Sequence, residues 1–214
     1  MPRRLKQLRT HEVALHKAGL GPVAGVDEAG RGACFGPVTV AACVLPSQPI
    51  PALDGIDDSK KLTASRRESL FGAIVDCALA WSVVHVPAQV IDRRGIQAAN
   101  LDGARRAVAK LAAPPGYVLV DAFRIPGLTV AQLPIIGGDS TARCIAAASI
   151  LAKVSRDRLI TKMARQFPDY GLEKHKGYAT AAHMDAVRRH GASREHRYSY
   201  ANVRSAHEHF ERSP

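Results

Sequence analysis

The chain has 214 residues, of which 46% are hydrophobic and 23% charged, a composition typical of an ordinary globular domain and not of a disordered chain. The longest aliphatic stretch, Val38–Leu45, is too short to cross a bilayer, and no apolar signal-peptide core follows the basic N-terminus. The four cysteines lie far apart without a C-x-x-C pair, which argues against a zinc or disulfide framework and predicts reduced thiols in the cytoplasm.

The formal net charge of +11 lies in the two flanks of the chain. Residues 1–20 carry five Lys and Arg against one acid, and residues 141–214 carry fourteen against seven. Residues 21–140 carry eleven of each sign. Basic flanks with the acids gathered elsewhere suit a protein that approaches phosphate and holds cations at one place. A high pI can also serve solubility alone, so charge by itself leaves nucleic-acid binding open.

The first elements are two strands and a helix. A basic N-terminal segment, residues 1–20, is predicted to be helical from about Leu5. Two valine-rich runs, Pro22–Asp27 and Pro37–Leu45, are typical of strands, with a glycine-rich turn between them and a proline-containing loop afterwards. Ser65 and Glu68 match a capping box, which predicts a helix over 66–78.

The later elements are strands that alternate with helices. Apolar spacing predicts the strands Trp81–Val86, Tyr117–Val120 and Leu133–Ile136 and the helices Gly95–Ala112 and Thr141–Gln166. The remaining residues, 168–214, are predicted to form turns and short basic helices, with their histidines on the surface. The sequence therefore predicts an α/β domain at 21–167, between the N-terminal segment and a basic helical extension at 168–214.

Three of the apolar runs end in carboxylates, at Asp27-Glu28, Asp121 and Asp139. A buried acid is costly unless something pairs with it, and a hard divalent cation such as Mg²⁺ or Mn²⁺ supplies that pairing. Each acid alone is explained as well by a polar turn, a strand end or, for Asp139, a helix N-cap. Three together favour a metal site. Asp27 and Glu28 can share it only where the strand ends or bulges, because neighbouring residues of a strand face opposite ways.

These acids belong to a series of motifs that runs through nearly the whole chain. The motifs are Val26-Asp27-Glu28-Ala29-Gly30-Arg31-Gly32, Asp58-Ser59-Lys60-Lys61-Leu62, Asp121, Gly138-Asp139, the stretch Ala147–Asp157 with Ser149, Lys153 and Arg156, and His175-Lys176-Gly177-Tyr178. In this order they resemble the bacterial ribonuclease HII family over residues 21–204. The resemblance implies a ribonuclease H-like mixed β-sheet flanked by helices, with a C-terminal helical part. It also implies a type 2 ribonuclease H, an endonuclease that cuts RNA in RNA–DNA hybrids and at single ribonucleotides in duplex DNA.

The resemblance assigns the metal site to Asp27, Glu28, Asp121 and Asp139. In the family, two Mg²⁺ or Mn²⁺ ions clamp the scissile phosphate, one activating the attacking water and the other stabilising the leaving 3′ oxygen. The expected products carry a 5′ phosphate and a 3′ hydroxyl.

Other matched residues are implied to bind substrate. The backbone of Gly30-Arg31-Gly32 resembles the segment that contacts the ribose 2′-OH, where a Cβ would prevent the approach. Tyr178 matches the tyrosine that stacks on the deoxyribose beyond the ribonucleotide. Lys60 and Lys153 are expected to contact phosphate. Without the resemblance, the glycines fit a strand-linking turn, Tyr178 a half-buried packing residue, and the lysines a solvated surface.

Two features depart from the family pattern or lack a signal. Ala122 follows Asp121 where glycine is common in the family, and the tail after Arg204 carries no sliding-clamp-binding signature. We expect a monomer without membrane contact. A non-catalytic nucleic-acid-binding module is supported by charge alone and is disfavoured by the four acids. Ribonuclease HIII shares the chemistry but carries a separate N-terminal substrate-binding domain, for which the residues before Asp27 leave no room.

Overall fold

The computed structural model describes residues 7–212, which belong to two compact units. The first unit holds residues 7–29 together with Val40–Val84 and Leu101–Val154. The second holds Gly30–Thr39, His85–Asn100 and residues 155–212. The units interleave along the sequence, so they follow different boundaries from the consecutive segments 1–20, 21–167 and 168–214 predicted above.

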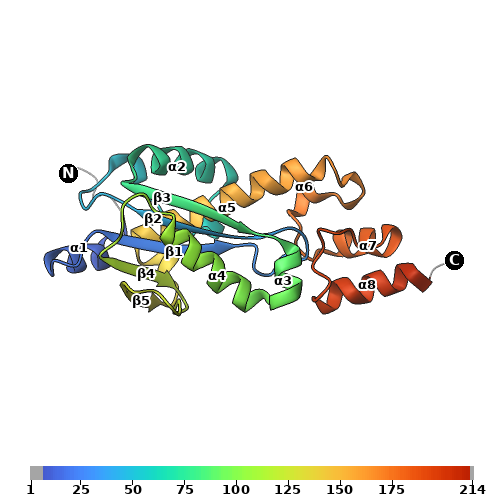
Figure 1. Cartoon of the computed structure of the whole chain (residues 1–214). Coiled ribbons are helices and arrows are strands. Elements are labelled where there is room, and N and C mark those ends of the chain that lie inside the picture. Colours follow the sequence, from blue (N-terminus) through green and yellow to red (C-terminus); the bar gives the residue numbers. More distant parts are fainter. Residues whose placement is uncertain (1–6, 213–214) are drawn as a thin grey trace. The chain divides into compact units, whose positions relative to one another are not determined.

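A mixed five-stranded sheet, in the order β3-β2-β1-β4-β5, is the central feature of the fold (Figure 1). Its strands are β1 (Val23–Ala29), β2 (Val38–Val44), β3 (Ala80–Val86), β4 (Tyr117–Asp121) and β5 (Ala131–Ile135). β4 pairs in parallel with both β1 and β5, with Val26 opposite Val120 and Asp121 opposite Ile135. All five strands are predicted from the apolar runs. β1, however, continues two residues past its predicted end at Asp27.

The helices alternate with the strands as predicted. They are α1 (Thr10–Lys17), α2 (Ala64–Cys77), α3 (Ala88–Arg94), α4 (Ile96–Ala109), α5 (Arg143–Ala164), α6 (Leu172–His175), α7 (Ala181–His190) and α8 (Ala201–Arg212). Short 3₁₀ turns are η1 (Pro51–Leu53), η2 (Ser59–Lys61), η3 (Gly138–Ser140) and η4 (Pro168–Tyr170). Among the helices of residues 7–212, none combines the length and apolar character needed to cross a membrane.

The N-terminus of α2 differs from the prediction. Thr63 caps the helix, because its hydroxyl accepts a hydrogen bond from the Arg66 amide at 3.2 Å. Ser65 therefore lies inside the first turn, and the helix begins two residues earlier than the Ser65–Glu68 pattern predicts. Thr63 and Ser65 are both good capping residues, so the sequence offers two starts and the pattern favours the wrong one.

Close packing of α5 on β1 forms part of the core of the first unit. Ala146, Ala147 and Ala148 are fully buried, as their small side chains suggest. A Cβ added to Gly25 in β1 would lie 2.1 Å from the carbonyl carbon of Cys144. The sheet and the helix backbone therefore touch at Gly25, which fixes the height of α5 above the strand that carries Asp27.

The basic N-terminal segment is packed onto the first unit over its described part. The Arg143 amide donates to the Leu8 carbonyl at 2.9 Å, and the Cys144 amide donates to the Glu12 carboxylate at 2.7 Å. Leu15 packs against the buried cluster that includes Val23. The helix begins at Thr10 within the described residues, and the predicted start near residue 5 lies outside them. These contacts make residues 8–15 part of the folded unit.

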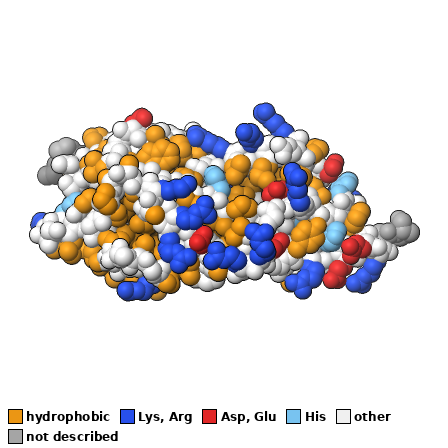
Figure 2. Space-filling model, viewed as in Figure 1, with side chains coloured by type: hydrophobic (Ala, Val, Ile, Leu, Met, Phe, Trp, Pro, Cys, Tyr) orange, Lys and Arg blue, Asp and Glu red, His pale blue; other side chains and the backbone are white. Residues whose placement is uncertain are grey.

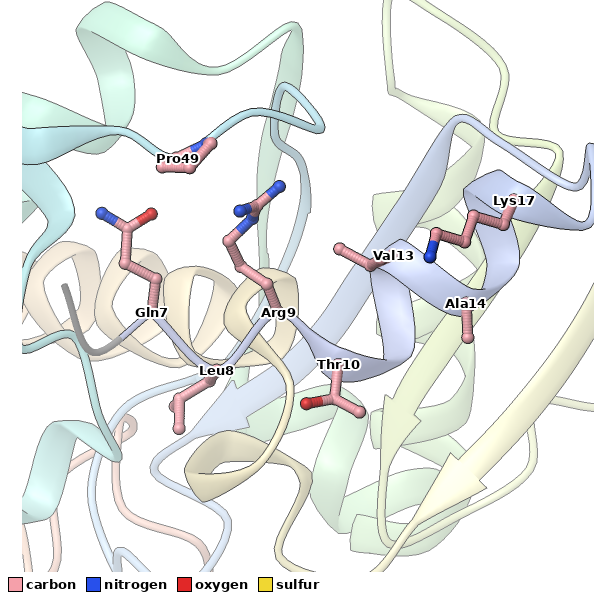
Figure 3. A pocket seen from close by; sticks show the side chains of 8 residues that line it. All are labelled: Gln7, Leu8, Arg9, Thr10, Val13, Ala14, Lys17 and Pro49. Carbon is pink, nitrogen blue, oxygen red and sulfur yellow. The ribbon is translucent and has the colours of Figure 1, made fainter. Parts of the chain in front are cut away.

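A cavity of about 750 Å³ lies beside α1 (Figure 3). Its lining includes the cationic side chains of Arg9 and Lys17 and the apolar side chains of Val13 and Pro49. Arg9 also donates to the carbonyl of Ser47. None of the acids predicted to bind metal lines this cavity, so it is separate from the candidate active site.

The prediction that the C-terminal histidines lie on the surface is wrong for two of them. His183 and His196 are fully buried in the second unit, and burial lowers the pKa of His183 to about 4 and that of His196 to about 3. Their Nε2 atoms lie 3.1 Å apart, while the Nδ1 atom of His183 lies 2.9 Å from the Tyr178 carbonyl and that of His196 accepts from the Ser193 amide. Every ring nitrogen therefore has a partner, which allows neutral imidazoles to be buried.

Candidate active site

Three of the four predicted acids meet in the first unit. Asp27 lies near the carboxyl end of β1 and Asp121 ends β4, and these two strands are adjacent and parallel. Asp139 lies in η3, after β5. Each of the three offers a carboxylate oxygen, and these oxygens lie within 4.8 Å of one another. The sequence predicts that these acids share a metal site, and the parallel pairing of β1 with β4 explains how Asp27 and Asp121 meet, because the carboxyl ends of parallel strands share one edge of a sheet.

The turn η3 brings Asp139 to the strand ends. The Gly138 amide donates to the Asp121 carboxylate at 2.8 Å, and Gly137 takes a left-handed conformation with φ of 65°. Asp139 itself is buried. The interpretation of Asp139 as a helix N-cap is wrong, because α5 begins four residues later, at Arg143. The carboxylate is thus available to the cluster.

The electrostatics of this cluster favour a bound cation. Burial, with the charges of Glu28 and Asp121, raises the pKa of Asp27 well above its ordinary value. Burial, with the charges of Asp58 and Asp121, also raises the pKa of Asp139. Carboxylates that repel one another in a buried place lose that repulsion when a divalent cation binds, and hard cations such as Mg²⁺ and Mn²⁺ prefer oxygen ligands. The donor set therefore fits a divalent metal ion.

Glu28 is placed differently from the other three acids. β1 continues through Glu28 to Ala29, so Asp27 and Glu28 follow each other inside a strand. Asp27 is buried and Glu28 only partly so, and Glu28 does not belong to the three-residue cluster. Its charge nevertheless acts on Asp27. A ligand role for Glu28 stays a prediction.

The Asp58-Ser-Lys-Lys segment lies against the acids of η3. The Lys60 ammonium lies 3.3 Å from an Asp139 carboxylate oxygen and 3.6 Å from Asp58, and its side chain is 76% exposed. Lys61 donates to the Ser140 hydroxyl at 2.8 Å. Because the Lys60 side chain is mostly in solvent, it can reach a phosphate without leaving the edge of the cluster.

Two buried serines support Asp27 and are absent from the predicted site. Ser149 on α5 hydrogen-bonds with the Asp27 carboxylate, which lowers the pKa of that carboxyl against the effect of burial. Its hydroxyl is hydrogen-bonded at 2.9 Å to that of Ser59. Lys153, predicted to contact phosphate, is half-buried one helical turn after Ser149. Both serines belong to the motifs quoted above, and this is the signal in the sequence that could have placed them in the site.

The remaining predicted site residues belong to the second unit. Gly30 has φ of +83°, a conformation that favours glycine. Arg31 and Gly32 are exposed, and the Arg31 guanidinium donates to the Gln97 side chain at 2.6 Å. Tyr178 is half-buried, with the Arg156 guanidinium carbon 5.3 Å from its ring centre. The structure thus places Gly30, Arg31, Gly32 and Tyr178 in the second unit, whereas the four acids and the predicted phosphate contacts Lys60 and Lys153 belong to the first.

Ala122, the departure from the family pattern, takes a left-handed conformation with φ of 60°. Its amide donates to the Ile135 carbonyl at 2.9 Å, which holds the turn after Asp121 in this shape. A side chain in this conformation costs about 1–2 kcal/mol, whereas glycine costs roughly 0.5–1 kcal/mol through unfolded-state entropy. The turn therefore keeps the conformation that a glycine would adopt.

We therefore expect Ala122→Gly to raise the free energy of unfolding by up to about 1.5 kcal/mol, the largest difference between the two costs. Cleavage should be retained, because the backbone that carries Asp121 is unchanged. Urea unfolding at a fixed pH measures the first effect. A loss of stability of the size usual for Ala→Gly would show that the turn stores no strain.

Positive charge on the face that carries α4 is interspersed with other residue types. Figure 2 shows Lys and Arg side chains there among acidic and hydrophobic ones. On α4, Asp102 lies 3.3 Å from Arg105 and 3.6 Å from Arg106. The positive charge of this helix is thus partly compensated locally, in keeping with the neutral balance of residues 21–140.

Comparison with known proteins identifies the family. The family model described as Ribonuclease HII matches residues 24–203. The chain belongs to the ribonuclease HII family. It is 65% identical to the ribonuclease HII of Corynebacterium efficiens over 205 residues, which cover 96% of this chain and 89% of that protein. Members of the ribonuclease HII family are metal-dependent endoribonucleases that act on RNA–DNA hybrids.

Solved structures confirm the predicted fold. The ribonuclease H2 of Pyrococcus horikoshii OT3 superposes with a TM-score of 0.76 at 27% identity, covering 89% of this chain and 99% of that one. Bst-RNase HIII, solved in complex with Mn²⁺, superposes with a TM-score of 0.65 at 23% identity, covering 94% and 74%. The mixed sheet flanked by helices is therefore the fold of the ribonuclease H2 and H3 enzymes.

Proposed function

We propose that this member of the ribonuclease HII family also incises duplex DNA at a single embedded ribonucleotide, leaving 5′-phosphate and 3′-hydroxyl ends. The observation that carries the chemistry is the convergence of carboxylate oxygens from Asp27, Asp121 and Asp139 within 4.8 Å. Such a cluster at the end of a buried sheet serves the hydrolysis of a phosphodiester, whose negative charge must be neutralised before water can attack.

In this proposal the cluster, with Glu28, holds two divalent ions, Mg²⁺ or Mn²⁺. Bound there, the ions supply an activated water and stabilise the charge that develops on the leaving oxygen. Ser149 and the Glu28 amide, which both hydrogen-bond to the Asp27 carboxylate, keep that ligand in one orientation. Lys60 sits beside Asp139 with most of its side chain in solvent, so it is placed to bind a phosphate oxygen of the substrate strand.

Recognition of the ribonucleotide is assigned to the second unit. Arg31 and Gly32, which are exposed next to the buried Gly30, offer main-chain hydrogen-bonding groups to a 2′-hydroxyl. An added Cβ at Gly32 would meet nothing within 4 Å in the free protein. The space over Gly32 is therefore open to a sugar. Tyr178 presents a half-buried ring that can stack on the deoxyribose following the ribonucleotide.

The test uses three labelled duplexes of one sequence: an all-DNA strand, a strand with one ribonucleotide, and an RNA strand paired with DNA. We expect cutting of the second and third only, with products that a 3′-end ligation assay identifies as hydroxyl ends. Cutting of the long hybrid without cutting at the single ribonucleotide would contradict the proposal, and so would 3′-phosphate products.

Tyr178→Ala tests the stacking role. Stacking on an aromatic ring is worth about 1–3 kcal/mol, so we expect the cleavage rate at a single ribonucleotide to fall about ten- to a hundredfold. A long hybrid offers a ribose in place of that deoxyribose and should be affected less. The measurement is the ratio of the two cleavage rates at one metal concentration, for the wild type and the variant. An equal loss on both substrates would make Tyr178 a general binding or structural residue.

A further inference from the structure

Arg156 on α5 is fully buried in the second unit, yet its hydrogen bonds go to main-chain carbonyls. Its Nε donates to Pro37 at 3.1 Å, one terminal nitrogen donates to Phe35 at 3.0 Å, and the other donates to Lys176 at 3.0 Å. These acceptors come from two segments far apart in sequence. The guanidinium thus joins the segment 30–37 to the segment 175–178 through all three of its nitrogens.

The same guanidinium touches the two substrate-binding features of the proposed function. It lies over the Tyr178 ring, 5.3 Å from the ring centre. A Cβ added to Gly30 would lie 1.9 Å from its Nε, so the Gly30 main chain presses directly on it. The two segments also bond to each other, because the Gly177 carbonyl accepts from the amides of Cys34 at 2.8 Å and Phe35 at 3.2 Å.

Two neutral histidines that are hydrogen-bonded to each other also hold the main chain of Tyr178. The Ser193 amide donates to Nδ1 of His196, which leaves the proton of that ring on Nε2. Nε2 of His196 therefore donates to Nε2 of His183, and Nδ1 of His183 donates to the Tyr178 carbonyl. This series assigns one tautomer to each ring and leaves the Tyr178 carbonyl held.

We propose that Arg156 is a positioning residue, which locks Gly30 and Tyr178 into one preformed surface for the ribose and the deoxyribose that follows it. The proposal rests on the substrate role of Tyr178 given above. A surface fixed before binding loses less conformational entropy when substrate arrives, which strengthens binding and favours the correct sugar pair. An arginine is required because a planar guanidinium directs several donors at once, whereas a lysine ammonium is a single point of charge.

The experiment compares Arg156→Lys with Arg143→Lys. Arg143, in the first unit, is also buried and also donates to main-chain carbonyls, those of Pro46 and Gln48, so it loses comparable bonds without touching either segment. We measure the cleavage rate at a single ribonucleotide divided by that on a long hybrid. The ratio should fall about tenfold in Arg156→Lys and stay at the wild-type value in Arg143→Lys. In the double variant that combines Arg156→Lys with Tyr178→Ala, it should fall no further than in Tyr178→Ala alone.

Three results would overturn the proposal. An unchanged ratio in Arg156→Lys, with a lowered ratio in Tyr178→Ala, removes the role of Arg156 and leaves that of Tyr178. An unchanged ratio in Tyr178→Ala removes the stacking role of Tyr178 and, with it, the positioning role of Arg156. A ratio that falls equally in Arg143→Lys shows a general effect of losing a buried arginine.

A variant that keeps Arg156 covers the case in which Arg156→Lys does not fold. His183→Gln removes the donor to the Tyr178 carbonyl and should lower the same ratio. Amide hydrogen exchange in that variant should rise in peptides that cover 175–180 and stay unchanged in those that cover β4. Exchange and a ratio both equal to the wild type would contradict a positioned Tyr178 segment and overturn the proposal.

Discussion

Asp121→Asn should lower the cleavage rate by more than about a hundredfold while the protein remains folded. Loss of a group that only supports a metal ligand typically costs 10–100-fold, and Asp121 contributes one of the converging oxygens itself. An amide is a poorer ligand and carries no charge. The measurement is single-turnover cleavage of a hybrid at a fixed Mn²⁺ concentration. Near-normal turnover would remove Asp121 from the site.

The same variant has a second readout and a matched control. The Asp121 charge raises the pKa of both Asp27 and Asp139, so its removal should leave the metal-free protein at least as stable as the wild type. Asp102→Asn also removes one acid, but from the ion pairs of α4. It should cut at the wild-type rate. A lower melting temperature of metal-free Asp121→Asn would show that the carboxylate is needed for folding and not only for chemistry.

Gly25→Ala should destabilise the protein by about 3 kcal/mol or more, at or beyond the upper end of the range for overpacked cores. The new Cβ would lie 2.1 Å from one main-chain atom of Cys144 and 2.3 Å from the Ile145 nitrogen, so β1 or α5 must shift as a whole. Loss of that much free energy is a large share of the stability of an ordinary domain. Urea unfolding measures it.

Gly72→Ala is the control for this substitution. Gly72 lies in α2, where an added Cβ would meet nothing within 4 Å. Alanine is favoured over glycine inside a helix by about 0.5–1 kcal/mol, so this variant should gain stability. A Gly25→Ala protein as stable as the wild type would show that β1 and α5 are less tightly packed than the structure indicates.

The positions of the strands were predictable because they depend on local pattern. Runs of apolar residues give the positions of all five strands. The carboxylates at the ends of three such runs predict a shared metal site, but the parallel pairing of β1 with β4, which brings Asp27 and Asp121 to one edge, joins segments far apart in sequence and has no local signal. The end of β1 was not predictable in this way, since Glu28 is polar and yet continues the strand to Ala29. The sequence around Asp139 fits a helix N-cap as well as a metal ligand. The choice between the two depends on the turn that the Gly138 amide holds against Asp121.

The buried polar residues were beyond the reach of the sequence pattern. His183 and His196 look like surface residues, and what permits their burial is a hydrogen bond between two side chains in separate segments. Ser59 and Ser149, 90 positions apart in sequence, are likewise joined by a hydrogen bond between their side chains. Arg156 lies in a motif that the family resemblance contains, but its partners are main-chain carbonyls, which leave no signature in the choice of residue.

The most direct test of the carboxylate cluster as the catalytic centre is the dependence of cleavage on divalent ions. The protein is first freed of such ions with a chelator, which is then removed, and Mn²⁺ or Mg²⁺ is restored stepwise in the presence of a labelled duplex that contains one ribonucleotide. We expect no cutting of the metal-free sample, full recovery as the ion is added, and no recovery for Asp121→Asn over the same range. Cutting by the metal-free protein at the full rate, or normal recovery of the variant, would contradict the account.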